Sequence, residues 1–128
     1  MQSPQQGIFD EGGKFHHYLE YSVKGAGDVS DIRPALRAII QDEVCQAQKA
    51  VVAFGADFWG NLTGEAAPAG LRAFETIGAA PSTQRDIWIW LQGDRTDLNL
   101  DAAMSVHRHL GAAASLELEL TGFSYHNN

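Results

Sequence analysis

This sequence of 128 residues has a single cysteine and no long apolar run, and its first residues do not resemble a leader segment. Cys45 is the single cysteine, so no intrachain disulfide can form, and this favours a reducing compartment. No apolar run approaches the roughly 18 residues that a membrane span requires. Residues 1–7 carry neither the basic start nor the apolar stretch of a secretory signal. We therefore expect a cytoplasmic protein without a membrane partner.

Positive charge is also sparse. The chain has 9 Lys and Arg against 16 Asp and Glu, which gives a formal net charge of −7. Because a protein that binds phosphate backbones needs clustered basic residues, we expect no nucleic-acid partner. Hydrophobic residues make up 45% of the chain, enough to build a core without disulfides or metals.

Short catalytic motifs are missing from the sequence. It has no HExxH, CxxC, P-loop or Rossmann glycine pattern, and no serine stands in a nucleophile elbow. Asp94, Asp97 and Asp101 gather near the start of a predicted helix, where the helix dipole favours negative charge and capping explains them. The residue chemistry alone indicates no reaction.

The five histidines do not form a metal-binding pattern. His16 and His17 are neighbours on a predicted strand, so their side chains point to opposite faces. His107 and His109 are two apart on a predicted helix, whereas metal-binding pairs on helices prefer spacings of three or four. His126 stands alone near the end. We therefore assign no metal-binding residue.

The first third of the chain predicts a strand followed by a helix. Residues 15–23 alternate with a period of two, and the more apolar face comprises Phe15, His17, Leu19, Tyr21 and Val23. Asp28 or Ser30 is expected to cap the helix, with Pro34 in its first turn. The apolar stripe of this helix is Ile32, Leu36, Ile39, Ile40 and Val44. Cys45 lies beside the stripe, and we expect a buried, inert thiol.

The middle of the chain is less regular. Val51–Phe54 predicts a second strand, and residues 57–62 a short helical turn. Residues 63–85 are rich in Gly, Ala and Pro, with a short strand predicted near residues 74–77. This long segment either lines a pocket or contacts a partner, or it is an ordinary surface excursion; the sequence leaves both readings open.

The last third predicts strand, helix and strand. In residues 86–92, Ile87, Ile89 and Leu91 share one face while Trp88 and Trp90 share the other, as in a central strand. The helix spans residues 97–110 and ends at Gly111; its stripe is Leu98, Ala102, Ala103, Val106 and Leu110. The final strand, residues 115–121, is expected to place Leu116, Leu118 and Leu120 on one face and Glu117, Glu119 and Thr121 on the other.

This order of elements predicts an α+β fold. It is the ferredoxin-like βαββαβ arrangement, an antiparallel sheet with both helices on one face, in one domain over residues 1–128. The other face is expected to present aromatic and polar side chains together, which suits an interface or a ligand wall. These residues are His16, Tyr18, Glu20, Trp88, Trp90, Glu117 and Glu119.

Several segments, taken together and in order, resemble the amino-terminal half of dye-decolourising-type (DyP) haem peroxidases. The start of the chain, residues 4–9, and the first strand, residues 16–20, match the family pattern. So do residues 52–55 with 57–59, and residues 70–72 with Phe74 and 81–84 in the long middle segment. The most diagnostic segment is Asp-Ile-Trp-Ile-Trp-Leu at residues 86–91 with Gly93 and Asp94, and residues 122–125 close the match.

The resemblance implies a parent protein that reduces hydrogen peroxide with haem b and oxidises dyes, phenols or similar organic donors. Its catalytic aspartate belongs to a Gly-x-x-Asp-Gly motif that follows the Gly-Phe-x-Tyr stretch, and the axial histidine and distal arginine come later. All of these lie beyond Asn128. We therefore expect no catalytic, cofactor-binding or metal-binding residue in this chain, no cofactor on the chain alone, and no activity without the carboxy-terminal half.

Two other readings stay open. The chain could form a dimeric α+β barrel that binds haem or another flat ligand, or a dimerisation module without a ligand. The expected partner is either the carboxy-terminal half of the same fold or a second copy, joined through the sheet face that carries Trp88 and Trp90.

Overall fold

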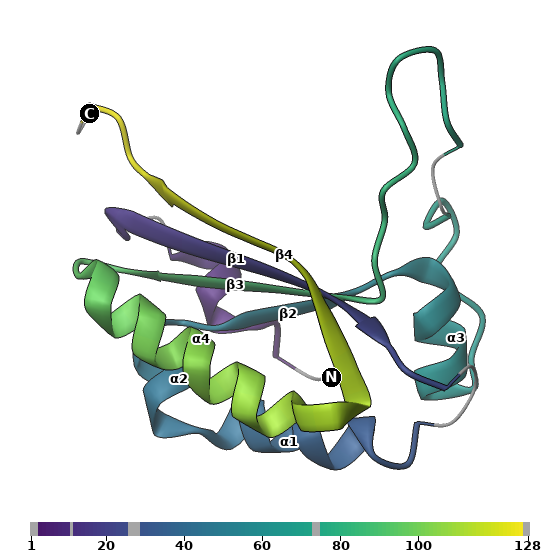
Figure 1. The fold of residues 1–128 in the computed structure, drawn as a ribbon, viewed down its shortest axis with the longest axis horizontal. Helices are drawn as coiled ribbons and strands as arrows, with labels where there is room; N and C mark the ends of the chain where they lie inside the picture. Colours follow the sequence, from purple (N-terminus) through teal and green to yellow (C-terminus); the bar gives the residue numbers. More distant parts are fainter. Residues whose placement is uncertain (1–2, 11, 26–28, 73–74, 127–128) are drawn as a thin grey trace.

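The computed structural model describes residues 3–10, 12–25, 29–72 and 75–126, which form a four-stranded antiparallel sheet (Figure 1). The spatial order is β2-β3-β1-β4, and each neighbouring pair is antiparallel. The strands are β1 (Phe15–Val23), β2 (Val51–Phe54), β3 (Ile87–Gly93) and β4 (Ala114–Phe123). The predicted ferredoxin-like sheet is therefore confirmed.

Helices cover one face of this sheet, as predicted (Figure 1). They are α1 (Ile32–Gln41), α2 (Glu43–Ala47) and α4 (Thr96–Leu110). A further helix, α3 (Ala56–Thr63), lies beyond the end of β2, and it is longer than the predicted turn. Two short 3-10 turns, η1 (Gln6–Phe9) and η2 (Gly111–Ala113), complete the elements of the described residues.

The hydrophobic core lies between the sheet and these helices. The alternation of β1 and β3 directs Leu19 and Tyr21 of β1 and Ile89 of β3 toward the helices, and all three are fully buried. Ile39 of α1 and Val106 of α4 pack against them. The inward sets of both central strands are thus confirmed.

The first predicted helix is broken at Asp42. Its backbone is extended there, with φ −71° and ψ 121°, and its carboxylate accepts hydrogen bonds from the backbone N–H groups of Val44 and Cys45, so that α2 restarts as a separate helix. The buried stripe of α1 is Ile32, Ala35, Leu36 and Ile39, and Ile40 lies beside it and is exposed. Val44, after the break, is exposed as well. The predicted burial of Ile40 and Val44 was wrong, whereas the predicted burial of Cys45 is confirmed.

The two predicted helix starts also shift. α1 begins at Ile32 with Asp31 at the N-cap position, not at Ser30, while Asp28 lies outside the described residues. α4 begins at Thr96, one residue before the predicted start, and it ends before Gly111, as predicted. Leu98 is 38% exposed, which corrects its predicted place in the core, because Asn99 is directed inward instead and donates through Nδ2 to the Phe15 carbonyl.

β4 departs from prediction at a β-bulge. Its register on β1 shifts so that Tyr21 pairs with Leu116 and Glu20 pairs with Leu118, which leaves Glu117 as the extra residue. Directly paired residues share a face of the sheet. Leu116 therefore lies on the helix side with Tyr21, and Leu118 lies on the other side with Glu20.

The bulge reverses the faces of the rest of β4. Leu118 and Leu120 lie on the face away from the helices, so the prediction that all three leucines share one face was wrong. Glu119, predicted on that far face, instead pairs with Leu19 on the helix side, and its Oε1 lies 2.7 Å from Nε2 of the buried His17. As a result of the bulge, the uncovered face carries Leu118 and Leu120, and the Glu119 carboxylate lies on the helix side.

The long middle segment projects from the sheet on the side away from the helices (Figure 1). Its described part contains a single isolated bridge, between Ile77 and Ala80, in place of the predicted short strand. Phe74, at the start of that prediction, lies outside the described residues.

Candidate functional site

The candidate site is the open face, by which we mean the sheet face that α1, α2 and α4 leave uncovered. β1, between β3 and β4, presents Tyr18 opposite Trp90 on one side and opposite Leu120 on the other. Glu20 similarly lies between Trp88 and Leu118. The predicted positions of Trp88 and Trp90 on this face are confirmed by their pairing and half-buried state.

Four rings on the open face form an aromatic cluster: His16, Tyr18, Trp88 and Trp90. Tyr18 stacks on Trp88 at 6.0 Å between ring centroids and on Trp90 at 6.5 Å. The two indoles are 6.2 Å apart, and His16 stacks on Trp90 at 5.9 Å. Contacts of this kind add to the stabilisation that comes from burial alone.

A chain of hydrogen bonds fixes one end of the cluster. Trp90 Nε1–H donates to His16 Nδ1 at 3.1 Å, and His16 Nε2 lies 3.5 Å from Ser124 Oγ. Ser124 Oγ in turn donates to the Gly13 carbonyl at 3.3 Å. The segment that follows β4 is therefore tied to the open face through His16.

The amino-terminal turn covers the opposite edge of the sheet. The side-chain amide of Gln5 donates to the Val52 carbonyl and accepts from the Val52 N–H, both at 2.8 Å, so it occupies hydrogen-bonding positions along the outer edge of β2. Gln92, fully buried at the end of β3, donates to the Gly7 carbonyl at 3.1 Å. This edge is thereby protected from pairing with another chain.

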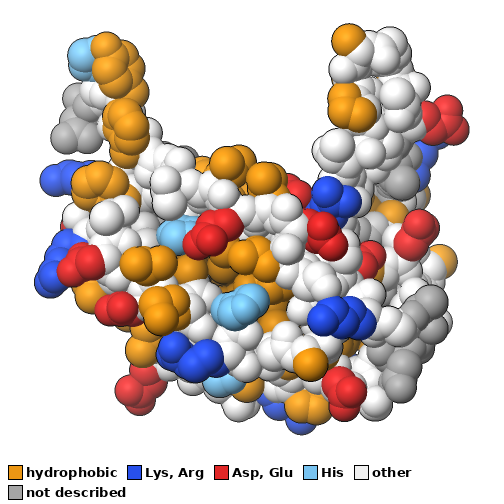
Figure 2. Space-filling view, viewed as in Figure 1, with side chains coloured by type: hydrophobic (Ala, Val, Ile, Leu, Met, Phe, Trp, Pro, Cys, Tyr) orange, Lys and Arg blue, Asp and Glu red, His pale blue; other side chains and the backbone are white. Residues whose placement is uncertain are grey.

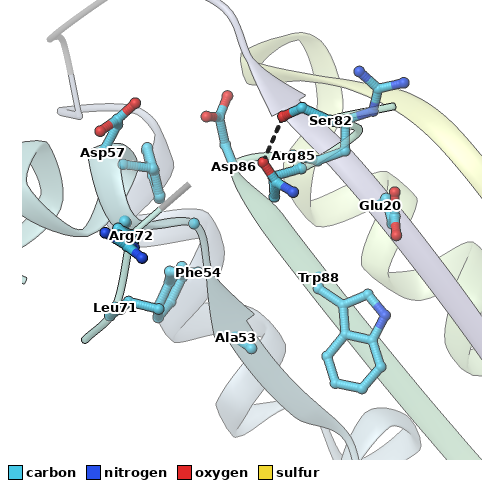
Figure 3. A pocket seen from close by; sticks show the side chains of 14 residues that line it. Glu20, Ala53, Phe54, Asp57, Leu71, Arg72, Ser82, Arg85, Asp86 and Trp88 are labelled. Atoms are coloured by element: carbon cyan, nitrogen blue, oxygen red, sulfur yellow. Dashed lines mark hydrogen bonds between the residues drawn. The ribbon is translucent and has the colours of Figure 1, made fainter. Parts of the chain in front are cut away.

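A hollow of about 480 Å³ adjoins the cluster at Trp88 (Figure 3). Figure 3 shows Leu71 and Arg72 beside Phe54 on one side of this space, with Trp88 and Glu20 on the other. In Figure 2 the long segment and the end of β4 rise on either side of the open face. The long segment contributes Leu71, Arg72, Ser82, Gln84 and Arg85 to the lining of this hollow.

The lining of the hollow mixes cations, carboxylates and apolar groups. Asp86 accepts from the Val23 N–H through Oδ2 at 2.7 Å and so serves the backbone. Arg72 and Arg85 form no ion pair within the described part of the chain, although Asp57 also lines the space. This lining does not combine a nucleophile with a hydrogen-bonded base.

The histidines are engaged separately. His17 contacts Glu119, and His107 Nδ1 lies 3.4 Å from the Tyr21 hydroxyl. His109 Nε2 lies 2.7 Å from Asp42 Oδ2, on the helix side of the molecule. No group of three or more His, Cys, Asp or Glu side chains suited to a metal ion occurs among residues 3–10, 12–25, 29–72 and 75–126.

Two buried acids on the helix side are held in their neutral forms. Burial, and then the charge of Glu119, raises the pKa of Tyr21 to about 12. Burial, and then the charge of Asp42, raises the pKa of the Cys45 thiol to about 11. The thiolate that nucleophilic chemistry would require is therefore disfavoured. In the part of the chain that is described, no helix has the length and apolar character to cross a membrane.

Part of this site was not predictable from spacing. The pairing of Trp90 with His16 depends on the register between β1 and β3, and the leucines of the open face depend on the bulge in β4. Arg72 lines the hollow from the long segment and Arg85 from the residues just before β3, and sequence spacing did not indicate that the two would lie at one site.

Comparisons with known proteins agree with this architecture. Residues 5–124 match the family model described as Dyp-type peroxidase, N-terminal. A putative Dyp-type peroxidase of Shewanella oneidensis is 24% identical, with a TM-score of 0.83 over 98% of this chain and 44% of its own. A DypB variant of Rhodococcus jostii in complex with haem is 25% identical, with a TM-score of 0.78 over 96% of this chain and 43% of its own.

The encapsulated Dyp-type peroxidase of Mycobacterium smegmatis is 23% identical, with a TM-score of 0.75 over 100% of this chain and 44% of its own. The chain thus spans less than half the length of these proteins. It belongs to the Dyp-type peroxidase family and corresponds to the N-terminal part of that family's fold.

Proposed function

We propose that this chain is the amino-terminal scaffold half of a Dyp-type haem peroxidase. The parent protein reduces hydrogen peroxide and oxidises dyes, phenols or similar organic donors. The family match over residues 5–124 carries the proposal, together with coverage of only 43–44% of the related chains. In this account the second half supplies the catalytic residues, and the 128-residue chain alone is inactive.

Haem b belongs to the second half in this proposal. An axial ligand needs a nitrogen directed at a cavity large enough for the macrocycle. Among the described residues, His17 and His109 are bonded to carboxylates and His107 lies against Tyr21. His16, on the open face, accepts from Trp90 through Nδ1. His16, His17, His107 and His109 therefore do not fit the role of axial ligand.

The open face is the contact surface for the second half. Half-buried indoles together with Leu118 and Leu120, 39% and 52% exposed, form an apolar surface that is stabilised when water is removed from it. When the second half is absent, a second copy of this chain takes its place through Trp88 and Trp90. The sole cysteine, Cys45, is buried and unpaired, which supports a reducing, cytoplasmic location. We propose neither a nucleic-acid nor a membrane partner.

Hemin titration of the purified chain tests the proposal, with a complete Dyp-type peroxidase as the positive control. We expect no stoichiometric shift of the Soret band and no peroxide-dependent dye oxidation by the chain alone. A sharp shift at one hemin per chain or per dimer would instead favour a self-sufficient dimeric barrel that binds haem.

A further inference from the structure

The two outer edges of the sheet differ in how they are covered. Gln5 occupies hydrogen-bonding positions along the outer edge of β2, whereas β4, at the other edge, has no further strand beside it among the described residues. Exposed edges usually carry a feature that prevents pairing with another chain. The bulge at Glu117 interrupts the edge of β4 near its start, but residues 118–123 pair with β1 in an unbroken register and leave a regular edge.

The hydrogen-bonding groups that this edge presents follow from the pairing with β1. The Ser124 N–H donates to the Lys14 carbonyl, so Phe123 and its partner on β1 do not bond to each other. Bonded and non-bonded pairs alternate along an antiparallel ladder. The backbone N–H and C=O groups of Glu119, Thr121 and Phe123 therefore point away from β1, and no group of the described residues binds them.

An apolar groove runs beside this edge on the helix side. α4 packs against β1 and β3, and a space of about 490 Å³ lies between α4 and β4. Leu100 and Met104 of α4 and Leu116 of β4 line it, and they are 47%, 52% and 37% exposed. A strand added to the edge of β4 would direct every second side chain toward this groove. Removal of water from the three side chains would favour such a strand.

Glu119 places a negative charge at the same point. Its Oε1 lies 2.7 Å from Nε2 of the buried His17, which holds the carboxylate in place, and Arg108, which also lines the groove, forms no ion pair with it. A residue directly opposite Glu119 on an added strand has its side chain on the same face, so a lysine or arginine there would reach the carboxylate. A second copy of β4 would instead bring further carboxylates, Glu117 and Glu119, to the edge of a chain whose net charge is −7.

We propose that the outer edge of β4 binds an extended segment of another protein by strand addition. The segment runs antiparallel to β4, with a lysine or arginine opposite Glu119 and, two residues further on, an apolar side chain over Leu116 and Met104. Main-chain hydrogen bonds to Glu119, Thr121 and Phe123 hold the segment, and the ion pair and the groove select it. The edge lies in the plane of the sheet, so this binding is separate from the covering of the open face and does not rest on the proposed function.

A peptide of sequence Thr-Val-Thr-Lys-Thr-Leu-Thr, with both ends blocked, tests the proposal in an NMR titration of the isotope-labelled 128-residue chain. We expect saturable shifts at Glu119, Thr121 and Phe123, whose amide protons exchange freely in the free chain and become protected in the complex. The same peptide with glutamate in place of lysine should bind about fivefold more weakly or worse, because the ion pair is lost. N-methylation of the peptide at its lysine removes a main-chain donor and should abolish binding.

Variants of the chain locate the site. Thr121→Pro removes an outward N–H and places the proline ring where the added strand would lie, but spares the hydrogen bonds to β1, so it should abolish binding. Glu119→Gln keeps an oxygen for His17 and should weaken binding of the lysine peptide about fivefold. Glu117→Gln makes the same change in net charge and should leave the affinity unchanged. Circular dichroism confirms that each variant is folded, and the N-methylated peptide requires no variant.

Several results would overturn the proposal. Amides of Glu119, Thr121 and Phe123 that are already protected in the free chain would show that a second copy occupies the edge. Loss of peptide binding in a longer native form of the protein would assign the edge to its second half. Equal binding of the lysine and glutamate peptides, or shifts confined to the open face, would also contradict it. None of these measurements involves haem, so failure of the hemin experiment is a separate outcome.

Discussion

Asp42 joins two helices, and its replacement by alanine should destabilise the fold measurably. Its Oδ1 accepts from the N–H groups of Val44 and Cys45 at 2.8 Å and 3.3 Å, which caps α2. Its Oδ2 accepts from Ser105 Oγ at 2.6 Å and lies 2.7 Å from His109 Nε2, both on α4. One carboxylate therefore holds the start of α2 against the last turns of α4.

The magnitude follows from these contacts. Loss of an N-cap costs about 1 kcal/mol. Ser105 is buried, and leaving its hydroxyl without a partner costs about a further 1–2 kcal/mol. The contact with His109 adds less, because it is partly exposed to water. We expect Asp42→Ala to lower the free energy of unfolding by about 2–3 kcal/mol, measured by urea denaturation.

The pH dependence provides a second test. Hydrogen bonds from Ser105 and then His109 lower the pKa of Asp42 below its usual range. Because the folded-state pKa lies below the unfolded value of about 3.9, this stabilisation is complete above that value and is lost as the pH falls below it. Asp42→Asn keeps a capping oxygen and should lose only part of the stability. An effect of Asp42→Ala under about 0.5 kcal/mol, or one that does not shrink in acid, would refute the reasoning.

Three further predictions concern packing, thiol reactivity and association. A Cβ at Gly55 would lie 2.5 Å from the Arg85 carbonyl oxygen, so Gly55→Ala should lower the free energy of unfolding by roughly 1–3 kcal/mol in the urea assay. Gly60→Ala is the control: the nearest atom to its Cβ would be 3.7 Å away, so the change should be neutral or stabilising. Cys45, with its raised pKa and full burial, should react with iodoacetamide only in denaturant; rapid alkylation of the native chain would contradict its placement. The isolated chain should self-associate in sedimentation experiments, and Trp88→Lys should weaken that association; a monomer at every concentration would rule it out.

The central strands and the fold class could be predicted because burial enforces a simple period. On β1 and β3 every second side chain enters the core, so alternation, with the aliphatic set assigned to the helix-covered face, places Leu19 and Ile89 inward and Trp88 outward. The positions of these strands, with both helices on one face, followed from the order of elements.

The remainder depended on local backbone geometry that periodicity does not encode. Asp42 suits a helix surface as well as a cap, and only the extended backbone at that residue separates α1 from α2. The extra residue in β4 inverts the faces of Leu118 and Glu119, and nothing in the alternating sequence marks it. The hydrogen bond from Trp90 to His16 depends on the register between β1 and β3, which are distant in sequence. The sequence therefore predicted which side chains share the open face, but not which of them contact one another.

The central claim is that this chain is the scaffold half of a larger peroxidase. Its most direct test is the intact mass of the protein purified from its native source, together with its haem content. If the chain is about 44% of the whole, as in its relatives, the mass should be somewhat more than twice 13.9 kDa, with haem retained. A native protein of 13.9 kDa would contradict the claim and favour a self-sufficient dimeric module.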